Sequence, residues 1–140
     1  MNCTEMKTTK VVAKIIHELI LSEPWLRNAD GSYVSERWVK NRKIVTFIDQ
    51  GKIAGFILYD IRSEISKNDS IFIHMMWVDS SLRGKGIGQM MVAKLKAKYK
   101  RKICIYAYAN QNGQRLLSAC GFAVGDIAYR ECIYWPREED

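Results

Sequence analysis

The chain has 140 residues, of which 48% are hydrophobic and 26% are charged, and its formal net charge is +7. This length fits one hydrophobic core but not two, so we expect residues 1–140 to form a single domain. No apolar run approaches the roughly 20 residues that a membrane helix needs. The first residues show no secretory signal pattern either, so we expect a cytoplasmic protein with no membrane partner.

The cysteines and histidines argue against a metal site. The four cysteines form no C-x-x-C pair, and the chain has only two histidines. Zinc sites usually combine such pairs with further Cys or His ligands, so we expect no metal. Reduced thiols are the rule in the cytoplasm. No base is paired with a thiol in the sequence, so we do not expect a cysteine nucleophile.

A cluster of positive charge lies between residues 94 and 102. Six of its nine residues are basic: Lys94, Lys96, Lys98, Lys100, Arg101 and Lys102. Such a cluster attracts nucleic acid, acidic protein or the phosphates of a cofactor. A solvated helix end is the simpler interpretation, because cations also suit the C-terminal end of the helix dipole. Weak nucleic-acid binding stays open from the sequence, and so does a homodimer.

Hydrophobic periodicity predicts two helices and three strands in the first half of the chain. The helices are expected at residues 8–22 and 35–42, and the strands at 43–49, 52–61 and 71–78. Gln50-Gly51 lies between the first two strands and predicts a tight hairpin turn.

The second half alternates helix and strand. We expect a helix at 86–100, a strand at 103–109, a short helix after Asn112-Gly113, and strands at 122–129 and 131–135. Gly121 stands where a helix stop is expected. The resulting order, α-α-β-β-β-α-β-α-β-β, is typical of a mixed α/β layer without internal repeats.

The most informative segment is Arg83-Gly84-Lys85-Gly86-Ile87-Gly88, which joins the strand 71–78 to the next helix. The first amides of a helix have no intrahelical partner, and the helix dipole adds positive charge there. Glycines let a backbone approach an anion closely, so the segment predicts a phosphate-binding turn. Its spacing fits neither a Walker A loop nor the Rossmann fingerprint.

The segment Val78–Gly88 resembles the acetyl-CoA motif of the GNAT superfamily of N-acetyltransferases, Gln/Arg-x-x-Gly-x-Gly/Ala after a strand that ends in Val. Asn110–Phe122 is similar to the family's Asn-x-x-Ala-x-x-Leu-Tyr-x-x-x-Gly-Phe helix, one strand later. The resemblance implies an α/β fold with a mixed, mostly antiparallel sheet flanked by helices. The central strands of that sheet splay apart to form the CoA cleft. Members usually open with a strand, which only residues 1–7 can supply here.

The same resemblance implies a function. It implies an N-acetyltransferase that moves the acetyl group of acetyl-CoA to a primary amine by direct attack, with the acceptor unidentified. The residues expected to bind the cofactor are Trp77, Val78, Arg83, Gly84, Lys85, Gly86, Ile87, Gly88 and Asn110.

Two residues are candidates for acid and base catalysis. His74 falls where many family members carry a Glu base, and an imidazole titrates near neutral pH. Strand alternation is expected to put Phe72, His74, Met76 and Val78 on one face. The Tyr that many members use to protonate the departing thiolate falls on Leu117, which we interpret as core, so Tyr108 is the candidate acid. A histidine and a tyrosine that only pack in the sheet are the alternatives.

Two other functions remain open from the sequence. Leu117 in place of Tyr favours an acetyl-CoA-binding domain with a regulatory or interaction role. The basic cluster favours a nucleic-acid-directed module. Trp38 is the best candidate for an acceptor pocket, because the second helix commonly borders the acceptor site in this family.

Overall fold

The computed structural model describes residues 2–23, 26, 34–62, 70–99, 104–109, 111–125 and 131–134. Within these ranges, seven strands form one sheet in the order β1-β2-β3-β4-β5-β7-β6. The strands are β1 (Asn2–Met6), β2 (Lys43–Asp49), β3 (Lys52–Arg62), β4 (Ser70–Val78), β5 (Cys104–Tyr108), β6 (Ala123–Val124) and β7 (Glu131–Tyr134). The helices are α1 (Lys10–Leu21), α2 (Glu36–Lys40), the 3-10 turn η1 (Ser80–Leu82), α3 (Ile87–Lys98) and α4 (Gln111–Ala119).

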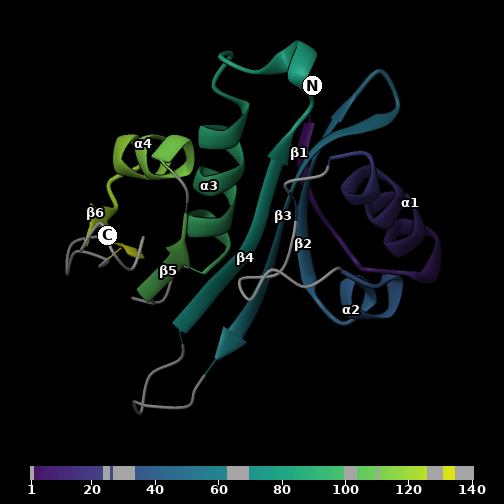
Figure 1. Ribbon diagram of the computed structural model, residues 1–140, viewed down its shortest axis with the longest axis horizontal. Helices are drawn as coiled ribbons and strands as arrows, with labels where there is room; N and C mark the ends of the chain where they lie inside the picture. Colours follow the sequence, from purple (N-terminus) through teal and green to yellow (C-terminus); the bar gives the residue numbers. More distant parts are fainter. Residues whose placement is uncertain are drawn as a thin grey trace.

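Helices cover both faces of the sheet (Figure 1): α1 and α2 lie on one face, and α3 and α4 lie on the other. Each face has its own buried core. In β3, Phe56 and Leu58 belong to the core under α1 and α2, whereas Ile57 and Tyr59 belong to the core under α3 and α4. The middle of β3 is therefore apolar on both faces, as expected for a central strand covered on both sides. None of the helices in the described ranges is long and apolar enough to cross a membrane.

Local sequence signals set the ends of several elements. The side chains of Thr9 and Ser35 cap α1 and α2 by accepting from backbone amides, as N-cap residues of these types usually do. Gln50 and Gly51 have φ of 50° and 74°. Two positive φ angles in a two-residue loop match the twist of the flanking strands and make a tight hairpin. Gly121 has φ of 90° just after α4, where a glycine ends a helix without strain.

Most of the expected elements are present, with differences at the ends. The strand at 71–78 and the helix at 86–100 correspond to β4 and α3, although Gly86 is the N-cap of α3 and not its first residue. A first strand, β1, precedes α1 and pairs antiparallel with β2. The expected strand 122–129 is represented by β6, and residues 126–130 lie outside the described part of the chain.

The expected common face of Phe72, His74, Met76 and Val78 is wrong. Tyr59 of β3 pairs with Ile73, but the preceding Leu58 pairs with Met75, so His74 is an extra residue in β4. Such a bulge shifts the alternation of side chains along a strand. Beyond it, Met76 and Val78 pack on the core under α3 and α4. His74 contacts Trp38 of α2 on the opposite face.

The sheet is antiparallel at each junction except one, between β4 and β5. These two strands are parallel and pair from Ser70 with Cys104 to Ile73 with Ala107. Although β4 continues to Val78, its last five residues have no partner on β5 among the described residues. The two central strands thus stop pairing halfway along β4, which leaves a gap in the middle of the sheet.

The contact between α3 and α4 generates a stability prediction. A Cβ added at Gly88 would lie 2.8 Å from Leu116 Cδ2. Helix propensity alone predicts that Gly88→Ala stabilises the protein by up to about 1 kcal/mol. We expect Gly88→Ala to fall short of this gain in the free energy of unfolding, because the end of the Leu116 side chain has to move aside first.

Urea unfolding of Gly88→Ala, Leu116→Ala and the double variant measures this. Gly88→Ala should stabilise the Leu116→Ala protein by more than it stabilises the wild type, since residues in contact are not additive. An equal gain of about 1 kcal/mol in both backgrounds would contradict the close helix contact.

Candidate functional site

A cavity of about 840 Å³ opens between the end of β4 and the helices α3 and α4. This is within the size range of small-molecule sites. It is lined by Met76, Trp77, Val78, Leu82, Arg83, Gly84, Gly86, Ile87, Gly88, Gln89, Gly113 and Leu116. The segment after β4 and the first turn of α3 therefore form one wall, and α4 forms the other.

The glycine turn has the features of an anion site. Gly84 and Gly86 both have φ of +80°, and a Cβ added at either would meet no atom within 4 Å. Gly86 is the N-cap of α3, and no side chain of the described residues caps this helix. The N-terminal end of α3 therefore faces the cavity with the positive end of its dipole. The backbone conformation requires glycine here, and the open space in front of it can admit a ligand.

Arg83 holds this turn against the rest of the molecule. Its Nε donates to the Val78 carbonyl at 2.9 Å, and its Nη2 lies 3.6 Å from Oε1 of Glu23. Lys85 lies in the same turn and is exposed. The two cations add formal charge beside the helix end, so the arrangement suits a phosphate group.

Most residues expected to bind the cofactor lie together. Trp77, Val78, Arg83, Gly84, Gly86, Ile87 and Gly88 all line the cavity. Lys85 is not among its lining residues, and Asn110 lies outside the described part of the chain.

Trp77 and Gly88 also have structural contacts. The ring of Trp77 stacks on Phe56 at 5.5 Å, and its Nε1 donates to Glu23 at 3.1 Å. Gly88 allows α4 to approach α3. Both residues therefore shape the cavity through packing.

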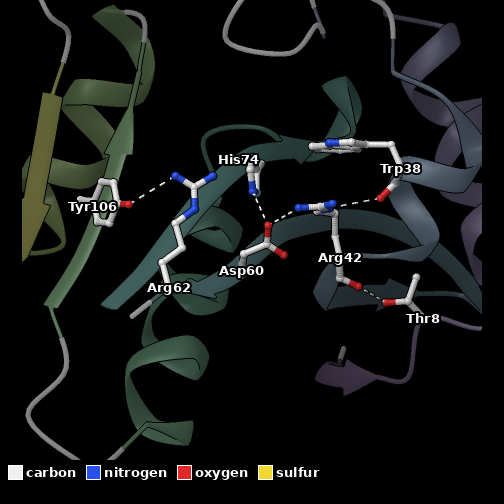
Figure 2. A network of polar contacts seen from close by, with 7 residues as sticks. All are labelled: Thr8, Trp38, Arg42, Asp60, Arg62, His74 and Tyr106. Atoms are coloured by element: carbon white, nitrogen blue, oxygen red, sulfur yellow. Dashed lines mark hydrogen bonds and ion pairs between the residues drawn. The ribbon is translucent and has the colours of Figure 1, made fainter. Parts of the chain in front are cut away.

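A network of polar side chains lies on the α2 face of the gap, centred on Asp60 of β3 (Figure 2). One oxygen of Asp60, Oδ2, accepts from Nε2 of His74 at 2.8 Å and from Nη1 of Arg42. Arg42 also donates to the Trp38 carbonyl at 3.2 Å, and its own carbonyl accepts from Thr8. These contacts tie β3, β4 and the end of α2 together around His74.

Aromatic rings surround the network. The ring of Phe72 lies 4.6 Å from His74, 4.8 Å from Tyr106 and 5.8 Å from Tyr108. The guanidinium of Arg62 lies 4.2 Å over Phe72 and donates to the Tyr106 hydroxyl at 3.5 Å. Three adjacent strands, β3, β4 and β5, thus contribute to one surface of charged and aromatic groups.

His74 has the properties of a neutral base. Its side chain is 14% exposed, and burial lowers the pKa of its imidazole below the ordinary value of 6.5. Asp60 opposes this shift, whereas the positive charges of Arg42 and Arg62 add to it. A carboxylate only accepts, so Nε2 carries the proton in the contact with Asp60. Nδ1 then carries the lone pair.

His74 and the cavity lie at the same stretch of β4, where the strand has stopped pairing with β5. Ile73 is the last residue of β4 that pairs with β5, and His74 follows it directly. Met76, Trp77 and Val78 of the same strand line the cavity. The imidazole of His74 therefore lies at the start of the gap on the α2 face, and the cavity lies on the α3 face.

The other candidates differ in accessibility. The side chain of Tyr108 is 51% exposed, on the same side as Phe72. Leu117 is 1% exposed in the core under α3 and α4, which confirms its interpretation as core. Burial raises the pKa of the Cys3 and Cys120 thiols, so both favour the unreactive protonated form.

Only part of the basic cluster lies in the described residues, namely Lys94, Lys96 and Lys98. Lys96 packs inward: its ammonium donates to the Cys120 carbonyl and lies 3.9 Å over the Tyr134 ring. Lys94 and Lys98 are exposed. At least one of the six cations therefore has a structural contact within the domain.

Sequence reasoning missed three residues of the network: Arg42, Asp60 and Arg62. One signal was available, because Asp60 and Arg62 follow the apolar residues 53–59 in a strand that is buried on both faces. Charged residues in such a strand need partners. Their partners come from other elements, so the sequence pattern alone does not identify them.

Comparisons with solved structures agree with this fold. A protein from Desulfovibrio desulfuricans assigned to the GNAT acetyltransferases is 13% identical, with a TM-score of 0.73 over 95% of this chain and 96% of that one. NAA60 from Arabidopsis thaliana, solved with acetyl-CoA, is 14% identical, with a TM-score of 0.68 over 96% and 100% of the chains.

The NatC complex, solved with a Gag peptide and CoA, contains a chain that is 17% identical, with a TM-score of 0.68 over 98% and 100% of the chains. The expected fold class, a mixed and mostly antiparallel sheet flanked by helices, is confirmed.

Comparisons of sequence identify the family to which the chain belongs. No curated protein sequence matches the chain at a significant level. The sequence profile of the acetyltransferase (GNAT) family matches residues 12–122, a segment that includes both β4 with its glycine turn and the helix α4. Because this match spans most of the chain, the protein belongs to the GNAT acetyltransferase family.

Proposed function

We propose that this protein is an acetyl-CoA-dependent N-acetyltransferase whose acceptor amine attacks the thioester directly. The observation that carries the proposal is the cavity at the glycine turn, which adjoins the gap between β4 and β5. The anion site lies on one face of the sheet and the neutral imidazole on the other, both along the part of β4 that does not pair with β5. Such an arrangement suits a reaction between two substrates that approach from opposite faces.

The residues around the cavity fit the cofactor. The uncapped N-terminal end of α3 and the positive-φ glycines Gly84 and Gly86 would receive the pyrophosphate. Arg83 holds the turn in place, and Lys85 adds charge at its rim. The unpaired edge of β4 up to Val78 offers backbone groups to the amide-bearing arm. Acetyl-CoA, when bound, supplies an activated acyl group on a good leaving thiol.

His74 would be the general base. An amine is protonated in water at neutral pH, so the enzyme has to remove a proton before nitrogen can attack the acyl carbon. Nδ1 of His74 carries a lone pair because Nε2 donates to Asp60. Asp60 thereby holds the ring in one tautomer and orientation and stabilises the charge that the ring gains. We assign Asp60 as a positioning residue for His74.

Tyr108 would return a proton to the leaving sulfur. It is the last residue of β5, the parallel neighbour of the strand that carries His74. Its ring lies 5.8 Å from the ring of Phe72. A thiol leaves readily as a thiolate, so this contribution is expected to be small. Leu117 provides no hydroxyl at the position where many family members have one.

An acetyl-CoA-binding protein without turnover is the alternative function. Leu117 favours it, because the usual acid is absent. The Asp60–His74 pair favours the transferase, because a fixed, half-buried imidazole has no evident role in a binding domain. The two proposals differ in whether any amine releases CoA thiol.

The cofactor assignment generates a charge-specific prediction. We expect Gly86→Asp to weaken CoA binding at least about 30-fold relative to Gly86→Asn, because like charges about 4 Å apart repel by a few kcal/mol. Asp and Asn are similar in size, and both tolerate positive φ better than most residues. Isothermal titration calorimetry with CoA measures the difference.

Gly51 provides the matched control for backbone strain. It has φ of +74° and open space where a Cβ would lie, as Gly86 has, but it lies in the β2–β3 hairpin. Gly51→Asp and Gly51→Asn should therefore cost similar stability and leave CoA binding unchanged. Equal CoA affinity of folded Gly86→Asp and Gly86→Asn would contradict the placement of the pyrophosphate.

The base assignment generates a pH prediction. The rate at low acceptor concentration should rise with pH through the pKa of His74, which burial holds below 6.5. Replacing His74 by Gln should lower the rate by roughly 10²- to 10⁴-fold and leave CoA affinity unchanged. In Asp60→Asn, the inflection from His74 should move to still lower pH, because the carboxylate that raises this pKa is lost.

His17→Gln is the matched control for this experiment. His17 lies in α1 and contacts the Val34 carbonyl at 2.8 Å, away from the network around Asp60. Its substitution should leave the rate and the pH profile unchanged. Full turnover by His74→Gln would show that His74 only packs in the sheet. If the pH of the inflection in the rate profile is unchanged in Asp60→Asn, Asp60 does not affect the pKa of His74.

A further inference from the structure

We propose that the α2 face of the gap binds a small acceptor that carries both a primary amine and a carboxylate, such as a free amino acid. Arg62 would bind the carboxylate, and His74 would take the proton from the amine. This inference rests on the proposed function, since it names the substrate class of the same site.

Arg62 is held in place, and its contacts with the described residues use little of its hydrogen-bonding capacity. Its guanidinium stacks 4.2 Å over Phe72, and its single polar contact to a described residue is with the Tyr106 hydroxyl at 3.5 Å. That distance is at the outer limit of a hydrogen bond. An arginine has five donors, arranged to bind a carboxylate in two places. No acidic side chain in the described part of the chain pairs with Arg62.

The charge balance of the network favours an anionic group. Arg42 and Arg62 contribute two positive charges, and Asp60 contributes one negative charge that Arg42 and His74 already contact. The lowered pKa of His74 keeps the imidazole neutral near neutral pH. The described residues of the network therefore carry a net positive charge before the acceptor binds. A carboxylate would neutralise it, whereas a polyamine would add like charge.

The separation of the two groups limits the size of the acceptor. His74 lies 4.6 Å and Arg62 lies 4.2 Å from the same ring of Phe72. The separation of imidazole and guanidinium cannot exceed the sum of these distances. The acceptor also has to leave room for a hydrogen bond of about 2.9 Å from a ring nitrogen at one end and from a guanidinium nitrogen at the other. The remaining length fits an amine and a carboxylate that are only a few bonds apart.

The surroundings suit a compact zwitterion. Figure 2 shows the side chains in one row, with Tyr106 and Arg62 on one side of His74 and Asp60, and Arg42 and Trp38 on the other. The Trp38 ring stands edge-on to His74 at 5.2 Å. Aromatic walls with a few oriented polar groups are typical of small-molecule sites.

The wild-type enzyme with acetyl-CoA is tested against four kinds of amine. These are the standard L-amino acids with β-alanine and γ-aminobutyrate, the carboxamides of the same compounds, spermidine, and peptides with a free N-terminus and an amidated C-terminus. Thiol release and product mass are measured. We expect at least one free amino acid to be acetylated with a kcat/KM about 10-fold or more above that of its amide.

Variants of Arg62 test the assigned contact. Arg62→Gln should raise KM for the free acid about 10- to 100-fold, leave kcat within a few-fold, and leave KM for the amide nearly unchanged. Arg62→Lys should retain part of the preference, because it keeps the charge but loses the two-point geometry. Arg37→Gln removes the same charge from an exposed position in α2 and should change neither KM.

Two outcomes overturn the inference and leave the transferase proposal intact. One is a preference for amides, spermidine or peptides over free acids in the wild type. The other is an equal loss for acids and amides in Arg62→Gln, which would make Arg62 a packing residue. A protein that binds CoA but acetylates none of these amines would overturn the transferase proposal as well.

Discussion

The loss of pairing between β4 and β5 after Ile73 and Ala107 is the constraint on which the rest of the site depends. Parallel strands that kept pairing to their ends would close the sheet and separate its two faces completely. Because β5 ends its pairing early, residues 74–78 have a partner strand only on the β3 side within the described part of the chain. Unpaired backbone in the middle of a domain has to find other partners. Arg83 meets part of this need at the Val78 carbonyl.

The bulge at His74 divides the chemistry between the two faces. If β4 alternated regularly, Phe72, His74, Met76 and Val78 would share one face. Because of the extra residue, His74 stays on the face of Phe72, Trp38 and Asp60, whereas Met76 and Val78 beyond it pack on the α3 core. Bulges often re-aim a side chain next to a functional site. Here, the change separates the proposed base from the anion site while keeping both at one gap.

Packing explains the identity of two residues that the family resemblance places at functional positions. Leu117 is fully enclosed in the core, so a tyrosine hydroxyl at this position would need new space and a new partner. Gly88 lies in the glycine-rich segment, but its missing side chain also lets Leu116 approach α3. The glycines of this motif therefore have two different roles. Gly84 and Gly86 permit the backbone conformation of the turn, and Gly88 permits close packing of α3 and α4.

The sequence by itself determined the order of elements and the place of the glycine turn, because both depend on local signals. Hydrophobic periodicity, the Gln50-Gly51 hairpin and the glycines before α3 act within a few residues of the chain. The tertiary structure decided which face His74 occupies and which residues accompany it. Arg42, Asp60, Arg62 and His74 come from separate elements, and their contacts depend on strand register. A single extra residue in one strand reverses every side chain beyond it, and no local pattern in the sequence marks that residue.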